Sequence, residues 1–366
     1  MTKKFLLFFS LLFSCTPLLA QESESIADSS TIDDFQRFTA LPVLGYSEET
    51  ELQYGAMAII FLKPSFKGGQ TGELDLTVYG TTKKQLTAMV SPQFFLFHDK
   101  VDGFVDFYYR NWTSNFFGVG NDPDMDSFRP YDLTSFYADG ILQTSFLLPQ
   151  VLSKAKYGLS YHFEKSKISF KDYEGEIAEP GDVDGLRNGI GYRVAWDSRD
   201  NTNWARHGFL ASWQHDFYNK ALGDFSYTRQ SLDLRGYSEF IWNTSMAVGF
   251  LWQRVDGNVP FDKLVGPDGI KRFRGVEVNY FSGNQGLFLQ TEFRKQLFWR
   301  LAGSIFFEGG KTGEYFSDLW RNKWHHGVGF GGQFALNTSE RLYARGDVSL
   351  IDFKDIGLTV YIREAF

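Results

Sequence analysis

Apolar and polar residues alternate along much of the chain. In 287–297 the apolar side chains recur at every second position, opposite polar residues such as Gln290 and Glu292. The same period of two occurs in 101–111 and 157–164. This period is typical of a β-strand with one apolar and one polar face. The pattern therefore predicts a sheet whose two faces meet different surroundings.

The alternation predicts fifteen strands, counted back from the C-terminus. They lie near 356–366, 339–351, 324–336, 299–311, 284–297, 241–255, 224–236, 207–218, 185–197, 154–166, 133–147, 101–111, 84–97, 70–81 and 52–63. An outer-membrane barrel of bacterial type has an even number of antiparallel strands. We therefore predict a sixteenth strand at Thr39–Tyr46, where Pro42 is tolerated because the strand would be edge-like. Fourteen and eighteen strands are the alternatives.

The predicted connections sort by length. Short turns fall at 98–100, 149–154, 298–300 and 337–339, and long segments at 112–133, 168–184, 256–282 and 312–322. If the last strand ends in the periplasm, all the short turns are periplasmic and all the long segments are outside, as in outer-membrane barrels. The fold predicted is an all-β, transmembrane antiparallel β-barrel. The competing class is a soluble β-sandwich, with its apolar faces inside.

Tryptophan positions separate these two classes. The map puts Trp196, Trp204, Trp242 and Trp299 at periplasmic strand ends, Trp112, Trp252, Trp320 and Trp324 at outer ends, and Trp213 mid-strand. Tryptophan prefers membrane interfaces, where the ring is buried and the N–H stays hydrated. Two such belts favour a barrel in a bilayer.

The composition excludes other classes. Aromatic residues make up 18% of the 366 residues, and there are 36 Gly, so residues that favour strands and turns are in excess. The mean hydropathy of -0.27 argues against a helical membrane bundle. With only 10 Pro and so many aromatic residues, the chain is not predicted to be disordered or collagen-like.

The N-terminus predicts export. Residues 1–20 contain Lys3 and Lys4, then an apolar stretch, and end at Ala20, which is typical of a cleaved signal peptide. Lipidation of Cys15, the one cysteine of the chain, is the alternative. Residues 21–37 are predicted to form a flexible acidic leader and 38–366 the barrel.

Cleavage removes two lysines and no acids, so the net charge changes from -7 to -9. This acidity argues against nucleic acid as a partner.

The last predicted strand ends the chain on an aromatic residue. An exported barrel chain that stops on Phe366 resembles outer-membrane proteins with a C-terminal assembly signal, here including Tyr361 and Phe366. A strand that ends the chain by chance is the alternative.

The most distinctive local sequence is GPDGIKRFRGVE at 266–277, in a long outer segment followed by five predicted strands. Here the chain resembles the BamA/TamA superfamily, also called the bacterial surface antigen family, through Phe273-Arg274-Gly275-Val276. The family motif is aliphatic-Arg-Gly-aromatic, at the tip of the sixth outer loop. A second family pattern, Phe-x-acid-x-Gly, is similar to 306–310. The resemblance implies sixteen strands with the sixth outer loop folded into the lumen.

Two departures accompany the resemblance. Val276 stands where the family has an aromatic residue, and residues 21–37 are too few for a periplasmic POTRA module.

An arginine inside a barrel needs an acidic partner to offset its loss of hydration. We predict Glu308 as the partner of Arg274, with Asp347 as a second candidate, while Gly275 lets the loop turn sharply. The alternative is a solvated loop with its three basic residues in water.

Catalytic chemistry is not predicted. The six histidines are scattered, and the chain has no Gly-x-Ser-x-Gly, Walker or His-Glu-x-x-His motif. The nearest Ser/His pair is Ser160 with His162, in no known motif. We expect no enzyme activity, no cofactor and no metal site.

Three functions are compatible with the sequence. The first is a barrel-only assembly or translocation factor of a Gram-negative outer membrane, in contact with membrane lipid, periplasmic partner proteins and unfolded outer-membrane protein clients. Its mechanism would use a weak seam between the strand with Pro42 and the last strand, because an unpaired edge can template an incoming strand. The second is a passive pore, and the third is a structural or loop-presenting barrel.

Overall fold

The computed structural model describes residues 37–47, 51–64, 66, 69–124, 126–171, 177, 180, 184–240 and 243–363. The predicted signal peptide with Cys15, the leader apart from Arg37, and Phe366 lie outside the described residues.

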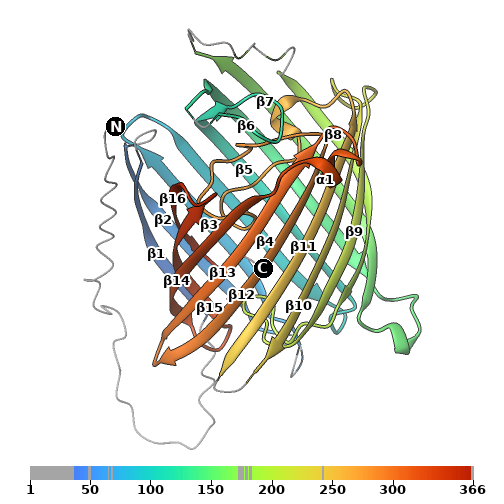
Figure 1. The fold of residues 1–366 in the computed structure, drawn as a ribbon. Coiled ribbons are helices and arrows are strands. Elements are labelled where there is room, and N and C mark those ends of the chain that lie inside the picture. The colour runs from blue at the N-terminus through green and yellow to red at the C-terminus, as the bar shows by residue number, and fades with distance from the viewer. Residues whose placement is uncertain are drawn as a thin grey trace, which may run out of the picture.

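Sixteen antiparallel strands form a single sheet in chain order (Figure 1). They are β1 (Phe38–Ser47), β2 (Glu51–Leu62), β3 (Gly72–Thr81), β4 (Leu86–Leu96), β5 (Val101–Phe116), β6 (Arg129–Thr144), β7 (Ala155–Phe170), β8 (Gly185–Asp197), β9 (Gly208–Tyr218), β10 (Tyr227–Glu239), β11 (Thr244–Gly257), β12 (Gln285–Phe298), β13 (Leu301–Gly313), β14 (His325–Asn337), β15 (Leu342–Ile351) and β16 (Asp355–Ile362). The predicted barrel of sixteen strands is confirmed, including the weak first strand. Within the described residues, no helix is long and apolar enough to cross a membrane.

Strands β5, β6 and β7 run further than predicted at their outer ends. β5 extends to Phe116 and β6 begins at Arg129, so much of the predicted segment 112–133 is strand. The added strand ends pair with each other and turn apolar side chains, such as Tyr131, toward a shared cluster with Phe261 of a long loop. Packing against this loop explains the extension.

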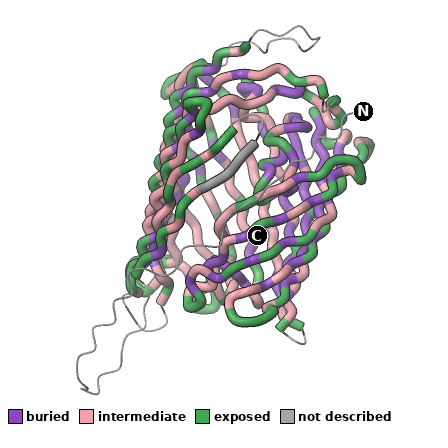
Figure 2. Tube along the Cα trace, turned by 90° about the vertical axis from the view of Figure 1, so that its left-hand side faces the viewer, coloured by how far each residue is buried: buried purple, intermediate pink, exposed green. Residues whose placement is uncertain are grey.

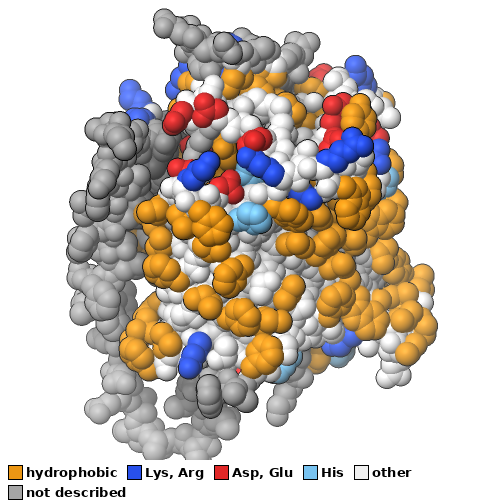
Figure 3. All heavy atoms as spheres, viewed as in Figure 1, with side chains coloured by type: hydrophobic (Ala, Val, Ile, Leu, Met, Phe, Trp, Pro, Cys, Tyr) orange, Lys and Arg blue, Asp and Glu red, His pale blue; other side chains and the backbone are white. Residues whose placement is uncertain are grey.

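The two faces of the sheet differ as predicted. Outward side chains such as Leu159, Ile305 and Phe330 are apolar and more than half exposed, whereas inward Glu292 and Arg294 are almost fully buried. Figure 2 shows exposed and less exposed residues alternating along the strands. In Figure 3 the wall is mostly apolar, and charged side chains gather near the end with the long loops.

Two tryptophans depart from the predicted belts. Trp204 is 2% exposed and packs on Tyr343 inside the barrel end, with ring centroids 4.3 Å apart. Trp112 lies on the inward face of β5 and meets Tyr79 edge to face at 5.7 Å. Both positions were predicted from chain position alone, which does not distinguish the lumen side of a strand end from the lipid side. Trp242 lies outside the described residues.

The seam between the first and last strands is joined by side chains. Among the described residues, no ladder pairs β1 with β16. At one end of the seam, Leu342 of β15 packs with Ile59 and Phe61 of β2. Beyond β16, Arg363 donates hydrogen bonds to Glu73 and Asp75 of β3, both at 2.7 Å.

Candidate functional site in the barrel lumen

The long segment 258–284 connects β11 to β12 and is the sixth outer loop. It enters the barrel in its upper half, where it appears as the orange trace in Figure 1. Isolated bridges tie it to itself, Val265 with Gly283, and to the third outer loop, Gly120 with Ser282. We refer to 258–284 as the lumen loop.

The local sequence makes the tip of the lumen loop compact. Asp268 Oδ1 accepts hydrogen bonds from the backbone N–H groups of 270–272 at 2.7–2.9 Å. The N–H of Gly275 donates to the carbonyl oxygen of Gly269 at 2.9 Å. Both glycines have positive φ, +75° and +81°, a conformation that glycine adopts without steric cost. Asp268 and the glycines thus close the turn that presents Arg274.

Arg274 is fully buried and contacts three carboxylates. Its Nε lies 2.7 Å from Glu308 Oε1, and its Nη1 lies 2.5 Å from Glu292 Oε2 and 3.2 Å from Asp347 Oδ2. Its backbone N–H also donates to Glu308 Oε2 at 2.7 Å. The guanidinium carbon is 3.5 Å from the centroid of the Phe306 ring, a cation–π contact. The structure therefore brings together Arg274, Glu308 and Asp347.

Two further arginines surround the same carboxylates. Arg345 of β15 contacts Glu292 at 2.7 Å and Asp347 at 2.9 Å, and it donates to Ser304 at 2.9 Å. Arg294 Nε lies 2.6 Å from Glu292 Oε1. Buried charges are tolerated where they are paired and hydrogen-bonded. We call this set the lumen ion cluster: three arginines, Arg274, Arg294 and Arg345, and three acids, Glu292, Glu308 and Asp347.

The sequence pattern did not identify Arg345 or the central position of Glu292. Alternation places Arg345 and Asp347 on one face of a strand, and Glu292 and Arg294 on one face of another. Alternation does not give the stagger between strands along the barrel axis, so it could not show that these side chains meet.

The tip of the lumen loop also touches the last two strands, β15 through Ser349 and β16 through Gly357. Ser349 Oγ donates to the carbonyl oxygen of Arg274 at 2.8 Å. A Cβ on Gly275 would lie 2.3 Å from Ser349 Oγ and 2.7 Å from the Cα of Gly357 in β16. Only two facing glycines allow this approach, so Gly275 fits the loop to β16.

Phe273 and Val276, on either side of the Arg-Gly pair, are buried in an apolar cluster. Phe273 is 1% exposed although its φ is +67°, an unusual conformation for a bulky residue. Val276, which stands where the BamA/TamA motif would place an aromatic residue, is 6% exposed. The cluster contains Phe117, Leu251, Val255, Val265, Phe273, Val276, Tyr280, Phe281, Phe288 and Ile351.

Arg272 forms a second anchor of the loop. Its Nη2 lies 3.0 Å from Asp233 Oδ2 of β10, and its Nη1 donates to Gln290 of β12. Because Arg272 and Arg274 are both buried, the alternative of a basic loop wholly in water is wrong.

Comparisons with known proteins bear on the fold. No family model matches the sequence, and no curated protein matches it. The structure is similar to BamA from Haemophilus ducreyi lacking POTRA domains 1–3, with a TM-score of 0.56, 12% identity, and coverage of 89% of this chain and 69% of that one. It is also similar to CdiB from Acinetobacter baumannii, with a TM-score of 0.57, 14% identity, and coverage of 90% and 60%. This chain has the barrel fold of BamA and CdiB.

The predicted resemblance to the BamA type is thus confirmed for the fold. The chain spans 60% of the length of the CdiB chain. At this identity the likeness concerns architecture.

Tyr361, predicted as part of a C-terminal assembly signal, faces the lumen of the BamA-type barrel. Its hydroxyl donates to Asp347 Oδ2 at 2.9 Å, so it borders the lumen ion cluster. It also packs against the buried Tyr237 and Ala247 of β10 and β11. The role of Tyr361 and Phe366 in assembly stays a prediction.

Ser160 and His162 do not form a nucleophile and base. Ser160 Oγ donates to Asp216 at 2.5 Å, while His162 contacts Asp139 at 2.9 Å and Asp216 at 3.0 Å. A catalytic serine requires a hydrogen bond to its base. In the part of the chain that the structure describes, no three His, Cys, Asp or Glu side chains are placed to hold a metal ion.

Proposed function

We propose that this chain is an integral outer-membrane barrel of a Gram-negative cell that takes part in inserting proteins, or moving protein or lipid, across that membrane. The observation that carries the proposal is the lumen loop, held by a buried ion cluster in a barrel of the BamA and CdiB fold. A polar lumen behind an apolar outer wall supports a position in lipid. Export by the N-terminal signal belongs to the same proposal.

The seam supplies the mechanism. Main-chain groups on an edge strand can pair with an incoming strand. Pro42 in β1 lacks an N–H, so it cannot donate a ladder hydrogen bond. The contact of Gly275 with Gly357 links the lumen loop to β16, so movement of the loop would release one side of the seam.

Partners follow from this mechanism. Clients would be unfolded outer-membrane proteins that add a strand at the seam, and periplasmic proteins would deliver them. Membrane lipid would surround the barrel whether it inserts proteins or moves protein or lipid.

The passive pore is the competing proposal. It requires a continuous aqueous path past the lumen loop. Glu292 and Arg294, on the inward face of β12, are instead buried in the lumen ion cluster, which supports a plugged lumen.

Photo-crosslinking in cells tests the seam mechanism. A benzophenone amino acid is placed at the exposed Ala40 of β1 or the exposed Val360 of β16, and at Ile305 of β13, also exposed, as the matched control. We expect adducts with outer-membrane proteins at Ala40 and Val360, and none at Ile305, because only the seam offers an edge. Equal labelling at all three positions, or none at the seam, would contradict the proposal.

A further inference from the structure

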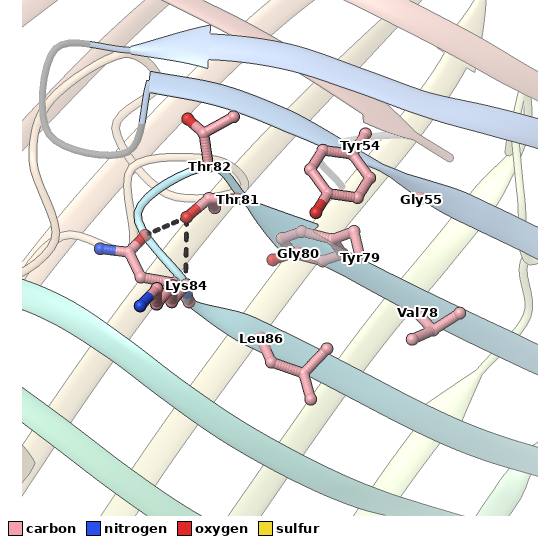
Figure 4. Close-up of a pocket in the computed structure, with 10 residues that line it drawn as sticks. Tyr54, Gly55, Val78, Tyr79, Gly80, Thr81, Thr82, Lys84 and Leu86 are labelled. Atoms are coloured by element: carbon pink, nitrogen blue, oxygen red, sulfur yellow. Dashed lines mark hydrogen bonds between the residues drawn. The ribbon is translucent and has the colours of Figure 1, made fainter.

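The outer ends of β2, β3 and β4 carry an apolar groove on the outward wall. Gly80 lies on the same outward face of β3 as Val78. Because glycine has no side chain, the wall has a depression at this position. Tyr54, Val78 and Leu86 border the hollow and are 41–52% exposed. The groove has a volume of about 470 Å³ and is shown in Figure 4.

A polar pocket adjoins this groove and shares Lys84 and Gln85 with it. Its volume is about 530 Å³. Thr113 lies on the same face of β5 as the exposed, outward Phe107 and Tyr109, so the pocket opens on the outer side of the wall. It is lined by Lys83, Lys84, Gln85, Asn111, Thr113, Asn115, Pro130, Asp132 and Lys171.

The three lysines of the polar pocket differ in their partners. Lys171 Nζ lies 3.1 Å from Asp132, and Lys83 Nζ lies 4.0 Å from Glu51. Among the described residues, Lys84 has no ion-pair partner. Its place is fixed by the hairpin, since its N–H donates to Thr81 O at 3.0 Å. Lys84 is therefore an available positive charge at the junction of groove and pocket.

We propose that these two hollows together bind an anionic, phosphate-bearing lipid of the surrounding outer leaflet, for which phosphatidylglycerol serves as the probe. One acyl chain lies in the groove at Gly80, and the phosphate headgroup meets Lys84 and the amide of Asn111 in the pocket. An apolar groove directly joined to a basic, polar pocket matches the two halves of such a molecule. Tyr54 at the border is of the residue type that prefers the membrane interface. The inference rests on the proposed membrane location.

The test uses the full chain in vesicles of phosphatidylglycerol and phosphatidylcholine in equal amounts. Lipid retained after gentle extraction is measured by native mass spectrometry. We expect wild type to retain phosphatidylglycerol in excess, and Lys84→Gln to reduce that excess about fivefold, because one lysine near a bilayer contributes this order of attraction. Gly80→Leu fills the groove and should lower the total lipid retained.

Matched controls exist on other strands. Lys354→Gln removes a lysine from another short outer hairpin, and Gly332→Leu fills an outward glycine with open space around it. Both are expected to behave as wild type. No excess of phosphatidylglycerol in wild type, or equal losses in Lys84→Gln and Lys354→Gln, would overturn the lipid site.

A competition with inorganic phosphate separates a lipid from a free anion. If phosphate displaces phosphatidylglycerol and Gly80→Leu has no effect, the pocket binds anions alone and the lipid assignment is wrong. Insertion is read separately by flotation of the vesicles. A chain that does not float contradicts the proposed membrane function itself, whereas a chain that floats without selective lipid contradicts only this inference.

Discussion

At the scale of single residues, Arg274 holds the lumen loop through contacts with three buried carboxylates. Replacing it by alanine leaves Glu308, Glu292 and Asp347 buried with one cation fewer. Loss of one partner from a buried ion pair costs about 3–5 kcal/mol. We expect Arg274→Ala to lower the free energy of unfolding by this amount in urea titrations. Arg254→Ala is the control, because Arg254 is exposed and pairs only with the exposed Asp256 among the described residues. Equal effects of the two changes would contradict a cluster role for Arg274.

Gly275 gives a second test at this scale. Alanine there meets both a positive φ of +81° and the close approach of Gly357. Gly118 has a similar φ of +85°, but nothing lies within 4 Å of a Cβ added to it. We therefore expect Gly275→Ala to lower the thermal unfolding midpoint more than Gly118→Ala. Similar midpoints would mean that the contact with β16 is not tight in solution.

Some members of the lumen ion cluster could be predicted from the sequence, and others could not. The pairing of Arg274 with Glu308 and Asp347 was predictable because a buried arginine requires an acid and the motif marked which arginine it was. Arg345 lies in no recognised motif, so the sequence did not single it out. Its role depends on the stagger of β15 against β12, and that stagger is set by the whole barrel and not by any local pattern.

At the scale of elements, one histidine joins the outer loops. His325, at the start of β14, is 1% exposed. Its Nε2 lies 2.5 Å from the carbonyl oxygen of Asn121 in the third outer loop, and its Nδ1 lies 2.6 Å from Asp352 in the eighth. Its ring stacks on Phe281 of the lumen loop with centroids 4.4 Å apart. The side chain thus touches three loops that are far apart in sequence.

We expect His325→Ala to speed proteolysis within 117–128 and 258–284, because it removes the side chain shared by these loops. His326→Ala is the control, since the neighbouring side chain is exposed and only its backbone N–H bonds Asp352. The measurement is limited proteolysis of the folded barrel, followed by mass spectrometry. If both variants are cleaved like wild type, the histidine does not hold the loops together.

The elements themselves were largely predictable. Period-two alternation located fifteen of the sixteen strands, and the requirement for an even count located β1 despite Pro42. Strands β5–β7 ran furthest beyond their predicted bounds, at their outer ends, where strand length depends on contact with Phe261 of a distant loop. Local alternation carries no information about such a contact.

At the scale of the whole molecule, two features combine: a sixth outer loop anchored inside the lumen, and a seam that side chains rather than a backbone ladder hold among the described residues. The loop meets the last strand at Gly357, so the plug and the seam are mechanically connected. This arrangement supports the proposed opening of the seam over a passive pore, which needs a permanent channel.

Planar-bilayer conductance tests this account most directly. Purified wild-type protein, Arg274→Ala and the control Arg254→Ala are recorded under the same voltage and salt. We predict small, flickering currents for wild type and Arg254→Ala, and markedly larger openings for Arg274→Ala, because the loop loses its main anchor. A large, steady wild-type conductance that Arg274→Ala leaves unchanged would contradict the plugged barrel and favour a passive pore.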